Sequence, residues 1–291
     1  MLNSCIRPSL EHPDVKLLCC SNLSAYHNVR TYYLRLYEAK FITGLVAGMM
    51  TQNNKIGYIA DYPIYGTPSA INAFAIGARM ANPKAVVKLA WSTCRDFDPD
   101  HPFSDDSVRI ISNRDINAPC HSSNEYGLYS INEDNSITNL AMPLLDWGKF
   151  YQTMIRNVLS GSFDGEIRAD SALNYWWGMS SGALDVLLSS RFDVTSARLI
   201  NHMKDSVRQE ILTPFEGTIT DQTGKLRCEP DRKLTPAEIL CMDYLVDNIE
   251  GNLPSIDMLT EAARPIVKLQ GLHGELRPDI SDISWINNEL G

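Results

Sequence analysis

Short apolar runs alternate with longer segments of helical periodicity over the first part of the chain. Because strands that alternate with helices form parallel sheets covered by helices on both faces, this order predicts an α/β fold. The predicted strands are 15–21, the start of 29–50, 55–60, 85–91 and 108–112, and the predicted helices are the rest of 29–50 and 68–81.

The pattern changes after residue 112, where two further strands are followed mainly by helices. Asp146 is a plausible N-cap and Gly161 a plausible C-cap of a helix over 146–161. Thr235 and Glu238 have the spacing of a capping box. The expected strands are 126–131, 137–143 and a stretch within 173–179; the expected helices are 146–161, 179–190, 196–212, 235–249 and 255–270, with a hairpin over 215–228.

The composition is that of a globular protein with a full hydrophobic core. Of 291 residues, 44% are hydrophobic and 21% are charged, and the net charge is -9. An acidic chain without a basic stripe is a poor candidate for direct nucleic-acid binding or for attraction to an anionic membrane. The seven cysteines include no CxxC pair, so we expect reduced, structural thiols. The six histidines form no metal spacing, and no motif requires a cofactor.

The N-terminal residues 1–16 contain no apolar segment of a signal peptide, and no apolar run approaches the roughly 18 residues of a membrane-spanning helix. No lipobox-like segment precedes Cys5. As written, the chain is expected to be soluble and cytoplasmic, with no membrane insertion. The alternative is a membrane-anchored lipoprotein of the cell envelope whose true N-terminus lies upstream.

The loop from Asp61 to Gly66 is the first candidate for a binding site. It follows the strand over 55–60, and in open α/β sheets ligands bind at the carboxyl ends of strands. Tyr62 and Tyr65 offer flat rings and hydroxyls, and Asp61 can accept hydrogen bonds. A purely structural role for Tyr65 in packing the loop is the alternative.

Several ordered motifs between residues 37 and 83 resemble the basic membrane protein family, the purine-nucleoside-receptor-like substrate-binding proteins of ABC transporters. An acidic residue, Glu38, precedes an apolar helix rich in Gly and Ala, which is followed by the strand motif Thr51 to Gly57. A helix end then carries Phe74, Gly77 and Asn82-Pro83. The resemblance extends from about 13 to about 224 and weakens after 139.

The resemblance implies a type I periplasmic-binding fold, in which two α/β lobes close on a small ligand, typically a nucleoside. The expected first lobe comprises 1–51 and 141–230, the second lobe 52–140, and a helical extension 231–291. Two departures weaken the transfer of ligand identity. The family's first strands have no counterpart before Pro13, so the first lobe is expected to be incomplete and the chain to be a fragment. The family's Gly-rich turn after 108–112 is also replaced.

Further candidate ligand contacts follow from the family and from composition. The resemblance implies that Glu38 contacts sugar hydroxyls, although an exposed Glu at a helix start is the simpler alternative. In a strand over 173–179, Trp176 and Trp177 point to opposite faces, so one is expected in the core and the other in the cleft or hinge. The complete set of candidates is Glu38, Asp61, Tyr62, Tyr65, Trp91, Asp115, Asn174, Tyr175 and Trp176.

No motif suggests a catalytic triad or an activated nucleophile, so we expect a binding protein rather than an enzyme. In an exported protein the partner would be an ABC permease, and the ligand would be a nucleoside-like small molecule. An intracellular ligand-sensing regulator built on the same fold is the alternative, favoured by the missing export signal and the free cysteines.

Overall fold

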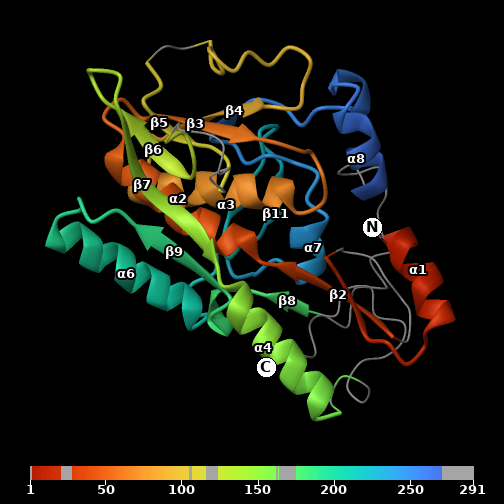
Figure 1. Ribbon diagram of the computed structural model, residues 1–291. Coiled ribbons are helices and arrows are strands. Elements are labelled where there is room, and N and C mark those ends of the chain that lie inside the picture. Colours follow the sequence, from red (N-terminus) through yellow and green to blue (C-terminus); the bar gives the residue numbers. More distant parts are fainter. Residues whose placement is uncertain are drawn as a thin grey trace.

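The computed structural model describes residues 2–20, 28–104, 107–115, 124–161, 163 and 175–270. Its strands form two sheets that contain parallel pairs and one short hairpin, with helices packed against them (Figure 1). The predicted α/β class is therefore confirmed. Most of the predicted elements are present, with shorter bounds.

The smaller sheet has three parallel strands in the order β1 (Leu17–Cys20), β2 (Val29–Leu34) and β8 (Tyr175–Trp177). Helix α4 (Trp147–Leu159) packs against it through Phe150 and Met154, and helix α1 (Leu2–Glu11) lies beside β1. The carboxylate of Asp146 accepts a hydrogen bond from the Lys149 N–H, so the predicted N-cap of α4 is confirmed.

The larger sheet has seven strands in the order β12-β4-β3-β5-β6-β7-β9. The pairs from β12 to β5 are parallel, and those from β5 to β9 are antiparallel. This mixture results from the hairpin-like return of the chain after residue 112. The strands are β3 (Lys55–Ala60), β4 (Val86–Trp91), β5 (Ile110–Ser112), β6 (Leu128–Ile131), β7 (Ile137–Leu145), β9 (Leu184–Leu188) and β12 (Ile249–Glu250).

Two buried helices, α2 (Leu36–Met50) and α3 (Thr67–Ala81), pack tightly against each other beside the larger sheet (Figure 1). The contact is possible because small residues face one another. A Cβ atom on Gly44 would lie 2.0 Å from the carbonyl oxygen of Phe74, and one on Gly77 would lie 2.1 Å from that of Phe41. The predicted close packing at the glycines of 41–50 is thus confirmed.

The C-terminal part of the described chain returns to the larger sheet. Asn72 of α3 is fully buried; its side chain donates to the Tyr244 carbonyl oxygen at 2.9 Å and accepts from the Val246 N–H at 3.0 Å. These bonds hold the extended segment that leads into β12. The remaining elements are η1 (Met179–Ser181), α6 (Val194–Arg208), α7 (Pro236–Leu240), η2 (Ile256–Met258) and α8 (Ala263–Gln270).

The predicted hairpin over 215–228 is confirmed as β10 (Ile219–Thr220) and β11 (Leu226–Cys228), which pair antiparallel. The carboxylate of Asp221 lies in its turn and accepts hydrogen bonds from Thr223 and Arg227. Burial alone would raise the pKa of Asp221, but these bonds outweigh burial and hold the pKa well below its usual value.

Two helix predictions are wrong, and the helix predicted over 255–270 is present only from Ala263, after the 3-10 turn η2. Residues 179–190 contain a short 3-10 turn and strand β9, because Gly182 takes a positive φ of 72° and the apolar run after it pairs with β7. The helix predicted over 235–249 ends at Leu240, although its capping box of Thr235 and Glu238 is present. Its continuation is extended because Asn72 and strand β4 bind its backbone.

The predicted boundaries of the lobes remain a prediction. Strand β9 and strand β12 both belong to the larger sheet, although the predicted division places 184–188 in the first lobe and 249–250 in the helical extension. Helix α2, assigned to the first lobe, packs on α3. Segments from across the whole sequence therefore complete the larger sheet.

Candidate functional site

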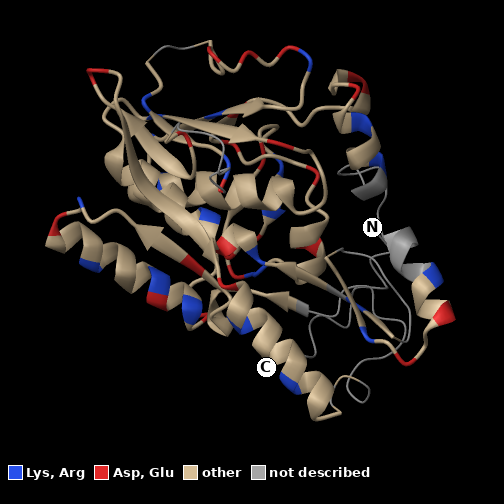
Figure 2. Ribbon diagram, viewed as in Figure 1, with Lys and Arg blue, Asp and Glu red and all other residues tan. Residues whose placement is uncertain are grey.

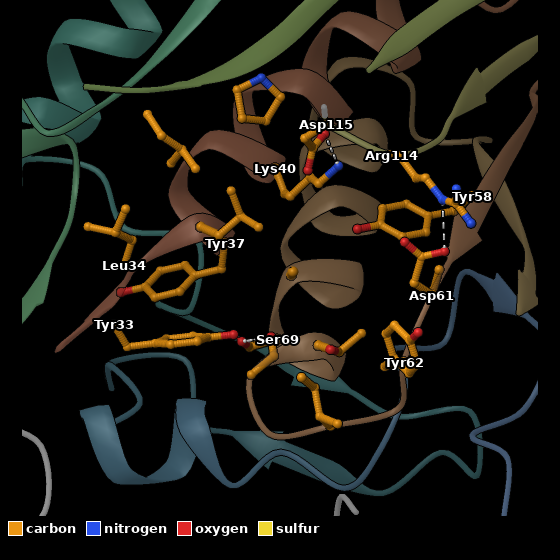
Figure 3. A pocket seen from close by; sticks show the side chains of 18 of the residues that line it. Tyr33, Leu34, Tyr37, Lys40, Tyr58, Asp61, Tyr62, Ser69, Arg114 and Asp115 are labelled. Atoms are coloured by element: carbon orange, nitrogen blue, oxygen red, sulfur yellow. Dashed lines mark hydrogen bonds and ion pairs between the residues drawn. The ribbon is translucent and has the colours of Figure 1, made fainter. Parts of the chain in front are cut away.

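A cavity of about 390 Å³ lies where strands of both sheets end. The loops after β3 and β5 contribute one side of the cavity, and the end of β2 and the start of α2, with Tyr33, Leu34 and Tyr37, contribute the other (Figure 3). Trp176 of β8 also belongs to the lining. Such a position at the carboxyl ends of parallel strands is typical of ligand sites in α/β folds. Its lining consists of Tyr33, Leu34, Leu36, Tyr37, Lys40, Tyr58, Ile59, Ala60, Asp61, Tyr62, Ile64, Gly66, Thr67, Ser69, Ala70, Asn113, Arg114, Asp115, Pro143, Leu145, Trp176 and Leu240.

Aromatic side chains form much of the wall. Tyr33 and Trp176 are register partners on the neighbouring strands β2 and β8. The rings of Tyr37 and Trp176 lie with their centroids 5.8 Å apart. Tyr62 comes from the loop after β3 (Figure 3). Flat rings spaced around a cavity of this size suit a planar ligand.

The other end of the cavity is charged. Lys40 of α2 is buried, and its Nζ lies 2.6 Å from a carboxylate oxygen of Asp115 and 3.4 Å from the Ser112 hydroxyl (Figure 3). Burial by itself lowers the pKa of Lys40, but the Asp115 carboxylate outweighs this effect and the pKa is raised. Burial raises the pKa of the neighbouring Tyr58 to about 12, so its hydroxyl stays protonated.

A second ion pair lies at the mouth of the same end. Arg114 Nε is 3.2 Å from a carboxylate oxygen of Asp61. That carboxylate also accepts from the Ser92 hydroxyl, and the Asp61 carbonyl oxygen accepts from the Thr93 hydroxyl. The loop after β3 is thus fixed to the loop after β4, which sets the position of Asp61 and Tyr62.

Glu38 lies at a second cavity, of about 280 Å³, on the other side of Tyr37 and Trp176. Its carboxylate accepts from the Met179 N–H at 2.7 Å and lies 3.4 Å from Arg35 Nη1, which is also 3.3 Å from Glu210. Burial raises the pKa of Glu38, and Arg35 and the Met179 N–H offset only part of this effect. Glu38 does not line the first cavity.

The structure brings together four of the predicted ligand residues: Asp61, Tyr62, Asp115 and Trp176 line the first cavity. Trp176 and Trp177 point to opposite faces as predicted, since Trp177 packs on Phe150 of α4 with ring centroids 5.2 Å apart.

Other predicted residues lie elsewhere. Tyr65 is buried outside the first cavity. Trp91 is also buried outside it, and its indole N–H donates to the Asn252 carbonyl oxygen at 2.8 Å. Asn174 lies outside the described residues, as does the side chain of Tyr175.

Sequence reasoning missed several residues of the cavity, among them Tyr33, Tyr37, Lys40 and Arg114. Lys40 could have been found, because it is a lone charge in an otherwise apolar helix pattern over 39–50. The two tyrosines precede and open that helix, where periodicity does not distinguish a cavity from the core.

The described residues offer neither a metal site nor a membrane span. Within these ranges no group of three or more His, Cys, Asp or Glu side chains is arranged to hold a metal ion. None of the described helices is long and apolar enough to cross a membrane. The described residues that line the first cavity include no His and no Cys.

Comparison with known proteins agrees with the motifs found in the sequence. Residues 2–100 match the Bmp family model, described as ABC transporter substrate-binding protein PnrA-like. The predicted family resemblance is confirmed over this part of the chain. It supports a substrate-binding component of an ABC transporter over the regulatory alternative.

Two relatives extend the match along the chain. A purine-binding protein of Brucella abortus is 24% identical over 261 residues, covering 86% of this chain and 73% of that protein. A Haloferax volcanii protein that bears the name of an ABC transporter glucose-binding protein is 28% identical over 185 residues. That match covers 59% of this chain and 45% of the Haloferax protein.

Among solved structures, a transcriptional activator of the comK gene from Bacillus halodurans has a similar fold. The TM-score is 0.54 at 15% identity, over 72% of this chain and 75% of that chain. At this identity the similarity concerns the fold alone.

Proposed function

We propose that the chain is the solute-binding component of an ABC transporter and that it holds a flat, polar solute of the purine or purine-nucleoside class in the first cavity. The observation that carries the proposal is the cavity itself. Its aromatic wall suits a planar ring, its charged end offers hydrogen-bond partners, and its volume of about 390 Å³ lies in the range of small-molecule sites.

The proposed mechanism is closure rather than catalysis. The first cavity takes residues from both sheets, so a bound solute would contact both and favour a closed arrangement over an open one. The Ser69 hydroxyl on the wall donates to the Gly66 carbonyl oxygen, which does not suit a nucleophile that needs a neighbouring base. The proposed partner is a membrane permease, and the proposed place is the cell envelope.

The ligand residues of this proposal are Asp61, Tyr62, Asp115 and Trp176, together with Tyr33 and Tyr37. The family match and the name of the Brucella relative favour a purine compound. The name of the Haloferax relative makes glucose the competing solute.

A binding screen tests the proposal. Thermal-shift and calorimetric titrations with adenosine, guanosine, adenine, guanine and glucose should show binding of at least one purine compound, since a ligand of the native state raises the melting temperature by mass action. Binding of glucose with no purine compound bound would overturn the proposed ligand class.

Variants locate the site. Tyr62→Ala should weaken purine binding by about fivefold or more, because loss of one stacking ring costs about 1–3 kcal/mol per base. The matched control is Tyr151→Ala, at a tyrosine that is 46% exposed on α4, away from the cavity. Equal affinities of the two variants would place the ligand elsewhere.

A further inference from the structure

The charged groups in the wall of the first cavity cancel one another. Among the described residues, the lining contains two cations, Lys40 and Arg114, and two anions, Asp61 and Asp115. Each cation is in an ion pair with one of these anions, at 2.6 Å for Lys40–Asp115 and 3.2 Å for Arg114–Asp61. The described part of the wall therefore presents no excess positive charge to a solute.

The two pairs differ in how easily they can open. The side chain of Arg114 is 63% exposed, so its pair with Asp61 is solvated and weak. Lys40 and Asp115 have side chains only 4% and 19% exposed. An anion that replaced Asp115 beside Lys40 would leave the Asp115 carboxylate largely buried without its cation, which is strongly unfavourable.

The helix N-terminus at the cavity does not replace the missing positive charge. Gly66, Thr67, Ser69 and Ala70 at the start of α3 belong to the lining. Pro68 has no N–H, the Thr67 N–H donates to the Ile64 carbonyl oxygen, and the Ala70 N–H donates to that of Gly66. The first turn thus offers at most the N–H of Ser69, whereas phosphate cradles use several backbone N–H groups.

We infer that the cavity selects solutes without net charge, and that the Lys40–Asp115 pair is the determinant that rejects phosphorylated forms of the same solute. This inference rests on the proposed function and specifies its substrate class. A neutral nucleoside can hydrogen-bond to Asp115 while the ion pair stays intact. A monophosphate brings negative charge close to the carboxylates of Asp61 and Asp115, and like charges at an interface are strongly discriminated against.

The test compares guanosine with guanosine 5′-monophosphate, and adenosine with adenosine 5′-monophosphate, by calorimetric titration of the full chain. The wild type should prefer each nucleoside by about tenfold or more. Asp115→Asn keeps an acceptor for Lys40 but removes one negative charge, so the preference should move by about tenfold or more toward the monophosphate. This ratio reports on charge, and a merely structural role of Asp115 would not change it.

Two further variants keep the result interpretable. Asp205→Asn makes the same change at a half-exposed ion pair with Arg208 on α6, outside both cavities, and should leave the ratio unchanged. Arg114→Gln removes a cation from the lining and should move the ratio further toward the nucleoside, which tests the inference even if Asp115→Asn fails to fold.

Equal binding of nucleoside and monophosphate by the wild type would overturn the inference while the proposed function stands. An unchanged ratio in both Asp115→Asn and Arg114→Gln would overturn it as well. Failure of every purine compound to bind would refute the proposed function and this inference together.

Discussion

Glu38 is the residue for which a ligand role and a structural role predict the most different effects of substitution. The family resemblance assigns it to sugar hydroxyls, whereas the structure places its carboxylate on the Met179 N–H and beside Arg35. We predict that Glu38 acts structurally. Glu38→Gln should leave purine affinity unchanged, and Glu38→Ala should act on stability alone.

The expected magnitudes follow from burial and pairing. The side chains of Arg35 and Glu38 are only 10% and 8% exposed. Loss of one partner from a buried pair costs about 3–5 kcal/mol, and Glu38→Ala should lie near the lower limit because Arg35 keeps Glu210 at 3.3 Å. Glu38→Gln keeps an acceptor for the Met179 N–H and should stay within about 1 kcal/mol of the wild type.

The pH dependence gives an independent check with a definite sign. The folded-state pKa of Glu38 is raised by burial above its unfolded value, so the protonated form favours the folded state. The wild type should therefore gain stability relative to Glu38→Gln as the pH falls through the folded pKa toward about 4.3. A lowered folded pKa would give the opposite trend.

Urea denaturation at several pH values measures the stability, and calorimetric titration with a purine compound measures affinity per folded molecule. Gly178→Ala offers a second route to the same contact, since a Cβ at this position would lie 2.3 Å from the Glu38 carboxylate. Its effect should be less than additive with that of Glu38→Ala, because both break one interaction. A large loss of affinity in Glu38→Gln with unchanged stability would refute the structural assignment and restore the ligand role.

Three further predictions concern stability and are measured by urea denaturation. Gly44→Ala should destabilise the protein by about 1–3 kcal/mol despite the better helix propensity of Ala, because its Cβ would lie 2.0 Å from the Phe74 carbonyl oxygen. The control Gly148→Ala, whose Cβ meets only the end of a side chain at 3.2 Å, should change stability by less than about 0.5 kcal/mol. Equal effects of the two substitutions would contradict the close contact between α2 and α3. Asn72→Ala should cost about 2–4 kcal/mol by leaving two backbone groups unpaired, and a neutral result would show that the segment leading to β12 is held otherwise. The pKa of Asp221 is lowered in the folded state, so the stabilisation by its carboxylate is present above the unfolded pKa of about 3.9 and is lost as the pH falls below it. The difference in free energy of unfolding between the wild type and Asp221→Asn should therefore shrink between pH 7 and pH 3. A constant difference would count against this linkage.

The elements between residues 17 and 112 could be predicted because their patterns are unambiguous, whereas helix α1 was not among the predicted elements. Helix α2 combines apolar residues at helical spacing with glycines that face α3, and the strands before and after it end at turn residues. The run after Gly182 was predicted as a helix because a short apolar run has no period that separates a buried strand from a helix. Its pairing with β7, over 40 residues earlier in the chain, decides the outcome.

The candidate site could be predicted only where a strand's end marks it. Asp61, Tyr62 and Asp115 were found because each follows a predicted strand. Tyr33 reaches the cavity through its register with Trp176, across more than 140 residues of chain. No local pattern reveals that pairing. The ligand role of Glu38 stays a prediction, because a family position carries no information about the partners that this chain provides, here Arg35 and Met179.

Helix α2 connects the two ion-pair systems. Glu38 and Lys40 lie two residues apart on its first turns, so they point to different sides, one to each cavity. Farther along, α2 is packed closely on the backbone of α3 and contacts strands β5, β7 and β9 of the larger sheet. At the start of α2, the Arg35 N–H donates to the Trp177 carbonyl oxygen at 2.7 Å, and Arg35 Nε donates to that of Trp176 at 2.9 Å. These bonds hold the start of the helix to the smaller sheet.

Under the proposed closure, the two sheets must therefore pivot at the turn between β2 and α2. The ion pair of Glu38 lies at this turn and that of Lys40 at the cavity, so substitutions at the first should change stability, and substitutions at the second should change which solute is bound.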